Sequence, residues 1–272
     1  MKNFVFSGGG AYAASELGIV KYILEKNYFD PTCDLAIGTS FGAISAGSLA
    51  LQFADDTMLN MLADFDRQVS NLLLGWSLAW SMISYPYTLG LANLEMILAP
   101  YFGGDENTTS RALITVATDL MEFKPVYFTN AMRQLNHTSI LESITASASI
   151  PLIFMPIKID NFICVDGGIM DNFPVNLVNI DGNVTYAFGS PLGQYDNLQP
   201  TQNIASYLST LINGAIYRLN KSKERNIPNY INYCPYSSYA SNMLDFSNYN
   251  EDFESGYKTA QTFFEKLGVN TK

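Results

Sequence analysis

The sequence predicts an α/β fold with a largely parallel central sheet covered on both faces by helices. Three observations lead to this prediction. Short apolar segments with strand character alternate with segments whose apolar residues recur at helical spacing, glycine-rich turns follow several strand candidates, and 272 residues can bury a sizeable core without disulfides. We expect a single domain over residues 1–272, because no repeat, long charge run or linker divides the chain.

The composition excludes several classes of function. A formal net charge of −10 argues against nucleic-acid binding, which needs a basic face, and against simple electrostatic docking on anionic lipid. Cys33, Cys164 and Cys234 are scattered, and no Cys/His cluster has zinc spacing. We therefore expect no metal, no cofactor and no nucleic-acid partner. The chain enters a strand candidate at once, without a signal-peptide pattern, so we expect a cytoplasmic or intracellular protein.

The first strand candidate spans residues 2–7 and ends in the glycine run Gly8, Gly9 and Gly10, after which a helix is predicted over residues 11–26. Glycines that open a helix expose backbone N–H groups, and the helix dipole adds partial positive charge there. The loop is therefore a predicted anion site. It could be a phosphate cradle, an oxyanion hole for acyl transfer, or a plain turn. A phosphate P-loop is disfavoured because no Gly-Lys-Ser/Thr follows.

The second strand candidate covers residues 35–37, and a helix of small residues is predicted over residues 41–53. Between them, Gly38 and Gly42 flank Ser40 in the Gly-x-Ser-x-Gly pattern of a nucleophile elbow. The two glycines give the space that a strained turn needs, so the hydroxyl stands at the carboxyl end of the strand. Ser40 is the candidate nucleophile.

An uncharged stretch over residues 68–94 has an apolar part shorter than the roughly 20 residues that a spanning helix needs. We interpret it as a buried or pocket-lining helix. The alternative is an interfacial lid that contacts lipid, and Trp76 and Trp80 keep this alternative open. Under that alternative the region 72–98 makes transient contact with a membrane surface.

The remaining elements follow in order from the same patterns. Strands are predicted over residues 111–119, 124–129 and 184–189, with two short strands flanking Asp160-Asn161. Helices are predicted over residues 139–150, 204–223 and 251–267, the first ended by Pro151.

A carboxylate provides the second chemical signal. Asp166 follows a strand candidate and precedes Gly167 and Gly168, which suggests a fixed loop that presents its side chain. A solvated turn carboxylate describes Asp171 better than Asp166. Sites in parallel sheets lie at the carboxyl ends of the strands, so the glycine loop, Ser40 and Asp166 are expected to meet there.

The single histidine, His137, decides between two mechanisms. It lies upstream of Asp166, whereas α/β-hydrolases order their triad as serine, acid and histidine. Either His137 is a base in an unusual order, or no histidine takes part and it is a surface or capping residue. We favour the second, in which Asp166 takes the proton of Ser40 directly.

A carboxylate with an ordinary pKa of about 3.9 is a weak base for an alcohol, so the site must compensate. Burial beside the serine would strengthen the base. Oxyanion donors must contribute as well, and the candidates are the backbone N–H groups of Gly9 and Gly10, helped by Phe41.

Four segments, taken together and in this order, resemble the patatin-like phospholipase family, especially its bacterial-type members. They are Ser7-Gly-Gly-Gly-Ala-Tyr-Ala with Leu17-Gly-Ile-Val, Ile37-Gly-Thr-Ser-Phe-Gly-Ala, Ala146-Ser-Ala-Ser-Ile-Pro, and Val165-Asp-Gly-Gly-Ile-Met-Asp-Asn-Phe-Pro-Val. The resemblance covers residues 1–189 and leaves 190–272 as a divergent part. It implies a three-layer α/β/α fold, a dyad of Ser40 and Asp166, an oxyanion loop at Gly8 to Gly10, and metal-independent hydrolysis of lipid acyl esters.

One position departs from the family pattern. The family usually has Lys or Arg two residues after the glycine run and then Gly, where this chain has Tyr12 and Ala13. The backbone donors survive that change, but the missing positive charge is expected to affect activity or headgroup preference.

The main expectation is a phospholipase A-type enzyme that acts on phospholipid or related lipid through an acyl-Ser40 intermediate. The alternatives are a catalytically weak lipid-binding or regulatory module, and a non-lipid esterase or thioesterase.

Overall fold

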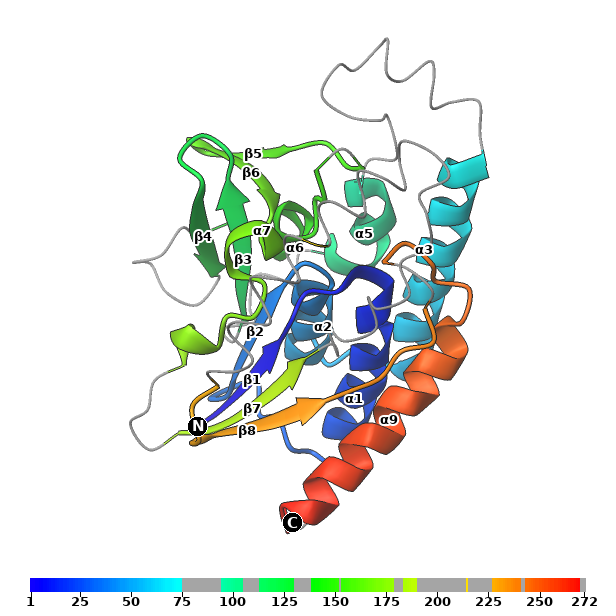
Figure 1. Ribbon diagram of the computed structural model, residues 1–272, viewed down its shortest axis with the longest axis vertical. Coiled ribbons are helices and arrows are strands. Elements are labelled where there is room, and N and C mark those ends of the chain that lie inside the picture. Colours follow the sequence, from blue (N-terminus) through cyan, green and yellow to red (C-terminus); the bar gives the residue numbers. More distant parts are fainter. Residues whose placement is uncertain are drawn as a thin grey trace.

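The computed structural model describes residues 1–74, 94–104, 113–129, 138–151, 153–178, 183–189, 214, 227–240 and 243–269. Among these residues, eight strands form one mixed sheet in the order β5-β6-β3-β2-β1-β7-β8, with β4 paired to β3 outside that path (Figure 1). The strands are β1 (Lys2–Phe6), β2 (Leu35–Thr39), β3 (Leu113–Asp119), β4 (Lys124–Thr129), β5 (Ile157–Ile159), β6 (Phe162–Asp166), β7 (Val184–Gly189) and β8 (Ile231–Pro235).

The sheet is mostly parallel, as predicted. Strands β3, β2, β1, β7 and β8 run parallel to their neighbours, while β4 and β6 run antiparallel to β3. The central strands have almost entirely buried side chains, since helices and connecting segments cover both faces. The fold class is therefore confirmed. Strands β4 and β6 lie at predicted strand positions, but their antiparallel direction was not predicted.

The helices of the described part are α1 (Ala14–Glu25), α2 (Phe41–Ala50), α3 (Asp55–Leu74), α5 (Leu94–Phe102), α6 (Ile140–Ser147), α7 (Gly168–Asp171) and α9 (Tyr249–Lys266), with short 3₁₀ turns η1 (Gly10–Ala13) and η3 (Val175–Leu177). Helices α1 and α9 lie side by side against the part of the sheet that contains β1, β7 and β8 (Figure 1).

Alternate residues of β1 belong to two separate cores. Phe4 and Phe6 are fully buried in the large cluster that the helices α1, α2 and α9 cover. Val5 points to the other face, where it belongs to a smaller cluster with Phe173 and Val175. This alternation is the period of two that a strand buried on both faces requires.

Strand β3 brings the ends of β2 and β6 together. One edge of β3 is fully occupied by β4. The other edge is shared: β2 pairs with its first half, as far as Thr39 opposite Val116, and β6 pairs with its second half, from Asp166 opposite Ala117. Asp166 therefore stands immediately beyond the end of β2, although β6 approaches from the opposite direction.

Several predicted boundaries differ from the structure. The helix predicted over residues 41–53 ends at Ala50, and Gln52 has a left-handed backbone that a helix cannot continue. The helix predicted over residues 11–26 begins with η1, and only from Ala14 is it an α-helix. Strand β8 and the 20-residue helix α3 were not predicted. The helix predicted over residues 204–223 lies outside the described residues, apart from residue 214.

The uncharged stretch lies largely outside the described residues, which include its beginning in α3 and its end in α5 but not residues 75–93. Its proposed contact with a membrane surface stays a prediction. Of the helices in the described ranges, none is both long and apolar enough to cross a bilayer.

Candidate active site

Ser40 lies in a sharp turn between β2 and α2, and its backbone is strained. Its φ of 55° and ψ of −128° are a combination that residues with a side chain rarely adopt. The turn is also crowded, because a Cβ atom on Gly38 would lie 2.0 Å from the carbonyl oxygen of Gly42, and one on Gly42 would lie 2.4 Å from that of Ser7. At both positions a side chain would clash with the backbone, which is why the elbow pattern has glycine there.

The Ser40 hydroxyl donates a hydrogen bond to Asp166, with 2.6 Å between Oγ and Oδ2. The second carboxylate oxygen, Oδ1, accepts the backbone N–H of Gly168 at 2.7 Å. Both side chains are buried, since Ser40 is 5% and Asp166 is 3% exposed. The carboxylate is therefore fixed in orientation, with one oxygen held by the backbone and the other directed at the hydroxyl.

Burial raises the pKa of Asp166 to about 6, while the hydrogen bonds from Ser40 and Gly168 oppose that rise. At neutral pH the carboxylate is still mostly ionised. It is nevertheless a stronger base than an exposed aspartate, whose pKa is about 3.9. Burial thus strengthens the candidate base, as expected for a carboxylate that must accept a proton from an alcohol.

The glycine loop lies against the elbow, because a Cβ atom on Gly8 would be 2.9 Å from the Cβ of Ser40. Gly8 is clamped by Asn172, which receives the Gly8 N–H on its carbonyl oxygen and donates its side-chain amide to the Gly8 carbonyl, both at 2.9 Å. In this arrangement the amide of Gly8 already has an acceptor, so it is not available as an oxyanion donor.

Three predicted donors are left. Within the described residues, the N–H groups of Gly9, Gly10 and Phe41 have no hydrogen-bond acceptor. Phe41 is the first residue of α2, where helical N–H groups have no partner within the helix. These amides are available to a negatively charged oxygen beside Ser40, as in an oxyanion hole.

The far side of the glycine loop is held by the C-terminal part of the chain. Gly10 has a φ of 54°, and a Cβ atom there would lie 2.4 Å from the carbonyl oxygen of Met243. The same carbonyl accepts the N–H of Ala11 at 2.8 Å. Nearby, the Tyr236 hydroxyl donates to the fully buried carboxyl of Glu16 at 2.8 Å. The segment after β8 therefore fixes the start of α1 and the loop before it.

Two residues that hold the site were given no role by the sequence analysis. Ser147 accepts the backbone N–H of Ser40 at 3.0 Å and donates to the carbonyl of Val116 at 2.5 Å, so it ties the elbow to β3. Asn172 clamps Gly8 as described above. The only available signal was their position inside two of the motifs that carry the family resemblance.

Gly167 and Gly168 lie where predicted, next to Asp166. A Cβ atom on Gly167 would be 2.0 Å from the carbonyl oxygen of Val116, which explains why only glycine fits. Asp171, in contrast, is not a solvated turn residue. It is 4% exposed, its carbonyl accepts the Thr39 hydroxyl at 2.8 Å, and its carboxylate accepts the Tyr127 hydroxyl at 3.3 Å. That interpretation was wrong because the turn is packed beneath β2 and β4.

His137 lies outside the described residues. Within the described ranges, no cluster of three or more His, Cys, Asp or Glu side chains could hold a metal ion.

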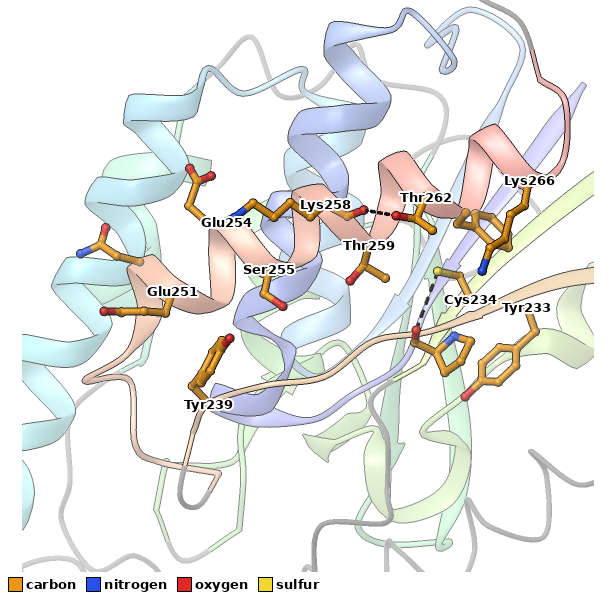
Figure 2. A pocket seen from close by; sticks show the side chains of 13 residues that line it. Tyr233, Cys234, Tyr239, Glu251, Glu254, Ser255, Lys258, Thr259, Thr262 and Lys266 are labelled. Atoms are coloured by element: carbon orange, nitrogen blue, oxygen red, sulfur yellow. Dashed lines mark hydrogen bonds between the residues drawn. The ribbon is translucent and has the colours of Figure 1, made fainter.

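One open cavity lies away from this chemistry. It is an open groove of about 920 Å³ between β8 and α9, as Figure 2 shows. Its lining includes Tyr233, Tyr239 and Lys258, and none of the predicted site residues takes part. Its charged side chains, which include Glu251 and Lys266, lie on the exposed face of α9. The groove is therefore separate from the candidate active site.

Similar proteins are found by sequence and by structure. A family model described as patatin-like phospholipase matches residues 4–178. Lysophospholipase NTE1 of Meyerozyma guilliermondii is 26% identical over 297 residues, which cover 96% of this chain and 19% of that protein. Lysophospholipase NTE1 of Scheffersomyces stipitis is 25% identical over 303 residues, which cover 98% of this chain and 18% of that protein.

This chain thus spans about a fifth of the length of these curated relatives. Among solved structures, VipD from Legionella pneumophila is similar with a TM-score of 0.50 at 14% sequence identity, covering 97% of this chain and 67% of that one. At this level of identity the likeness concerns the fold.

Proposed function

This chain belongs to the patatin-like phospholipase family, and from that membership we propose that it is a lipid acyl hydrolase of the phospholipase A type. The proposal assigns the nucleophile to Ser40 and the base to Asp166. The observation that carries it is the hydrogen bond of 2.6 Å between the Ser40 hydroxyl and the buried carboxylate.

In the first half of the reaction, Asp166 accepts the hydroxyl proton while Ser40 Oγ forms a bond with the ester carbonyl carbon of the lipid. The carbonyl oxygen becomes an oxyanion, which the N–H groups of Gly9, Gly10 and Phe41 stabilise. Collapse of this intermediate breaks the ester C–O bond, and Asp166 returns its proton to the leaving alcohol. The product is an acyl-Ser40 enzyme.

In the second half, water replaces the alcohol. Asp166 accepts a proton from the attacking water, the same amides hold the second oxyanion, and the proton returns to Ser40 Oγ as the fatty acid leaves. Each proton travels between Asp166 and an oxygen, so the cycle requires no histidine.

The test is release of fatty acid from phosphatidylcholine in mixed micelles by the wild type, Ser40→Ala, Asp166→Asn and His137→Ala. We expect the first two variants to lose about 10³-fold or more in kcat, because each removes a reacting group. The His137→Ala variant should retain activity. Undiminished activity in Asp166→Asn, or its loss in His137→Ala, would contradict the dyad.

A second candidate function rests on Tyr12, which stands where the family usually has a cation. Burial raises the pKa of its hydroxyl, and Asp245 adds to that rise, so the side chain is neutral at pH 7. A catalytically weak lipid-binding module would tolerate this loss of charge next to the glycine loop. Labelling with a fluorophosphonate separates the two functions: an active enzyme is modified at Ser40, whereas a weak module is left unmodified.

A further inference from the structure

The hairpin between β3 and β4 ends in a tip with three exposed apolar side chains. The tip spans residues 120–123, where Leu120 is 37%, Met121 is 69% and Phe123 is 62% exposed. The N–H of Leu120 donates to the carbonyl of Ile163 at 2.8 Å, and the Ile163 side chain is 36% exposed. We call Leu120, Met121, Phe123 and Ile163 the apolar tip. The first three are exposed residues of the turn after β3, and Ile163 is an exposed residue of the neighbouring strand β6.

The backbone at Phe123 is unfavourable for this residue. Its φ is 50°, a left-handed conformation in which glycine or asparagine is the usual turn residue. The turn itself is well formed, since the Phe123 N–H donates to the carbonyl of Asp119 at 2.9 Å. The ring, however, contacts no other aromatic ring within the described residues. A strained, exposed aromatic residue is an outlier that points to a contact outside the chain.

The apolar tip lies near the candidate active site. Asp166 pairs with Ala117 of β3, and the tip begins three residues further along the same strand, a distance of about 10 Å at the usual rise. The β3–β4 hairpin and the β5–β6 hairpin project side by side from this end of the sheet (Figure 1). A surface that binds the tip would therefore be close to Ser40 and Asp166.

The charges around the tip are mixed. Glu122 forms an ion pair with Lys124, and Lys158 stands opposite Ile163 in the register of β5 and β6. Asp160 lies in the neighbouring turn. With no excess of positive charge here and a net charge of −10 for the chain, an anionic surface is disfavoured. The combination fits zwitterionic headgroups above an apolar layer.

We propose that the apolar tip inserts into a zwitterionic phospholipid surface and presents the neighbouring Ser40 site to lipid in that surface. The choice of a lipid surface as partner rests on the proposed function. This contact is separate from the one predicted for residues 72–98, because the tip consists of the turn between β3 and β4 and of Ile163 in β6. Insertion would bury the Met121 and Phe123 side chains at the boundary between headgroups and acyl chains.

The first experiment measures co-sedimentation with phosphatidylcholine vesicles. The double variant Met121→Ser/Phe123→Ser is expected to bind roughly 10- to 100-fold more weakly than wild type, since it removes two large apolar side chains from the contact. A matched control is Leu267→Ser, which removes a 41% exposed apolar side chain after the end of α9 and should bind as wild type does. Equal binding of the double variant and the wild type would overturn the proposal.

Two activity assays separate this proposal from the proposed function. The double variant should hydrolyse a short soluble ester at the wild-type rate but phospholipid in vesicles more slowly. If the wild type hydrolyses no ester, the proposed function fails, while vesicle binding still tests the tip. If the double variant turns a wild-type dimer into a monomer without lipid, the tip is a contact between copies and the proposal is overturned.

A single substitution tests the meaning of the strained residue. In Phe123→Asn the left-handed turn is kept with a residue that prefers it, so the melting temperature should stay the same or rise while vesicle binding falls. A lower melting temperature would show that the ring supports the fold, and it would contradict an external role.

Discussion

The two turns of the candidate site are held in different ways. The elbow around Ser40 is fixed by nearby glycines and by Ser147, all within the residues 4–178 that the family model matches. The glycine loop is fixed on one side by Asn172, in the same part of the chain, and on the other by the carbonyl of Met243, far beyond it.

The elbow is held from within the part of the chain that the family model matches, whereas the glycine loop is also held from outside it. The hydrogen bonds that hold the proposed nucleophile and the proposed base come from residues inside the matched part. The loop that contains the candidate oxyanion donors Gly9 and Gly10 is also held by Met243, so the C-terminal part contributes to the candidate site. Substitutions can test whether the two supports are as separate as the contacts suggest.

The largest effect is expected from Gly10→Ala. A Cβ atom at this position meets the Met243 carbonyl at 2.4 Å and is forced into a left-handed backbone, so the loop must move away from the oxyanion. Loss of one oxyanion donor costs about 10²–10³-fold in kcat, and we expect a loss of that size on a soluble ester. Gly104→Ala is the control, because a Cβ atom there has no neighbour within 4 Å. A fully active, folded Gly10→Ala would show that the C-terminal support is dispensable.

The second prediction concerns the pH dependence of activity and stability at Asp166. Its pKa is raised to about 6, so kcat/KM should rise as the pH passes through 6 and level off above it. The same raised pKa means that the folded state binds this proton more tightly than the unfolded state does. The contribution of this group to the free energy of unfolding therefore falls by about 3 kcal/mol as the pH rises from about 4 to about 6.

The variant Asp166→Asn should not show this loss of stability at higher pH, because asparagine does not titrate. Chemical denaturation should find it about 3 kcal/mol more stable than wild type at pH 8 and equally stable below pH 4. Asp252, whose pKa burial also raises to about 6, is unchanged in both proteins and cancels from the difference. An Asp166→Asn variant that is less stable than wild type at pH 8 would show that the carboxylate supports the elbow rather than straining it.

The smallest effects compare one hydroxyl from each support. Ser147→Ala leaves the Ser40 N–H and the Val116 carbonyl without this partner, and Tyr236→Phe removes the hydrogen bond to the buried Glu16 carboxyl. Each should lower the free energy of unfolding by about 1–3 kcal/mol in urea titrations. If the supports are separate, the two losses add in the double variant within about 0.5 kcal/mol. A larger deviation would mean that the elbow and the loop are coupled.

The sequence predicted the parts of the fold that leave a pattern in side chains. The strands β1, β2, β3 and β6 and the elbow were found because apolar runs and glycines mark them, and the structure brings the predicted Ser40 and Asp166 within hydrogen-bond distance. The direction of β6 was not predicted, because a buried strand has the same composition in either direction.

The support from Met243 could not be predicted either. The group that accepts the Ala11 N–H is a backbone carbonyl, which every residue possesses, so no side chain reveals it. Likewise, Gly8 is unavailable as a donor because its N–H donates to the Asn172 carbonyl, a contact between positions 164 residues apart. Sequence patterns identify chemically special side chains, but they do not show which backbone groups are already occupied.

The shared edge of β3 has a consequence for the order of folding. Ser40 and Asp166 are 126 residues apart in the chain and meet only after β2 and β6 have both paired with that one strand. Contacts of such long range form late, because closing the intervening chain costs entropy that local structure does not repay. During refolding, labelling of Ser40 by a fluorophosphonate should therefore report the final assembly of the sheet. It should appear later than the helical signal from α1 and α9.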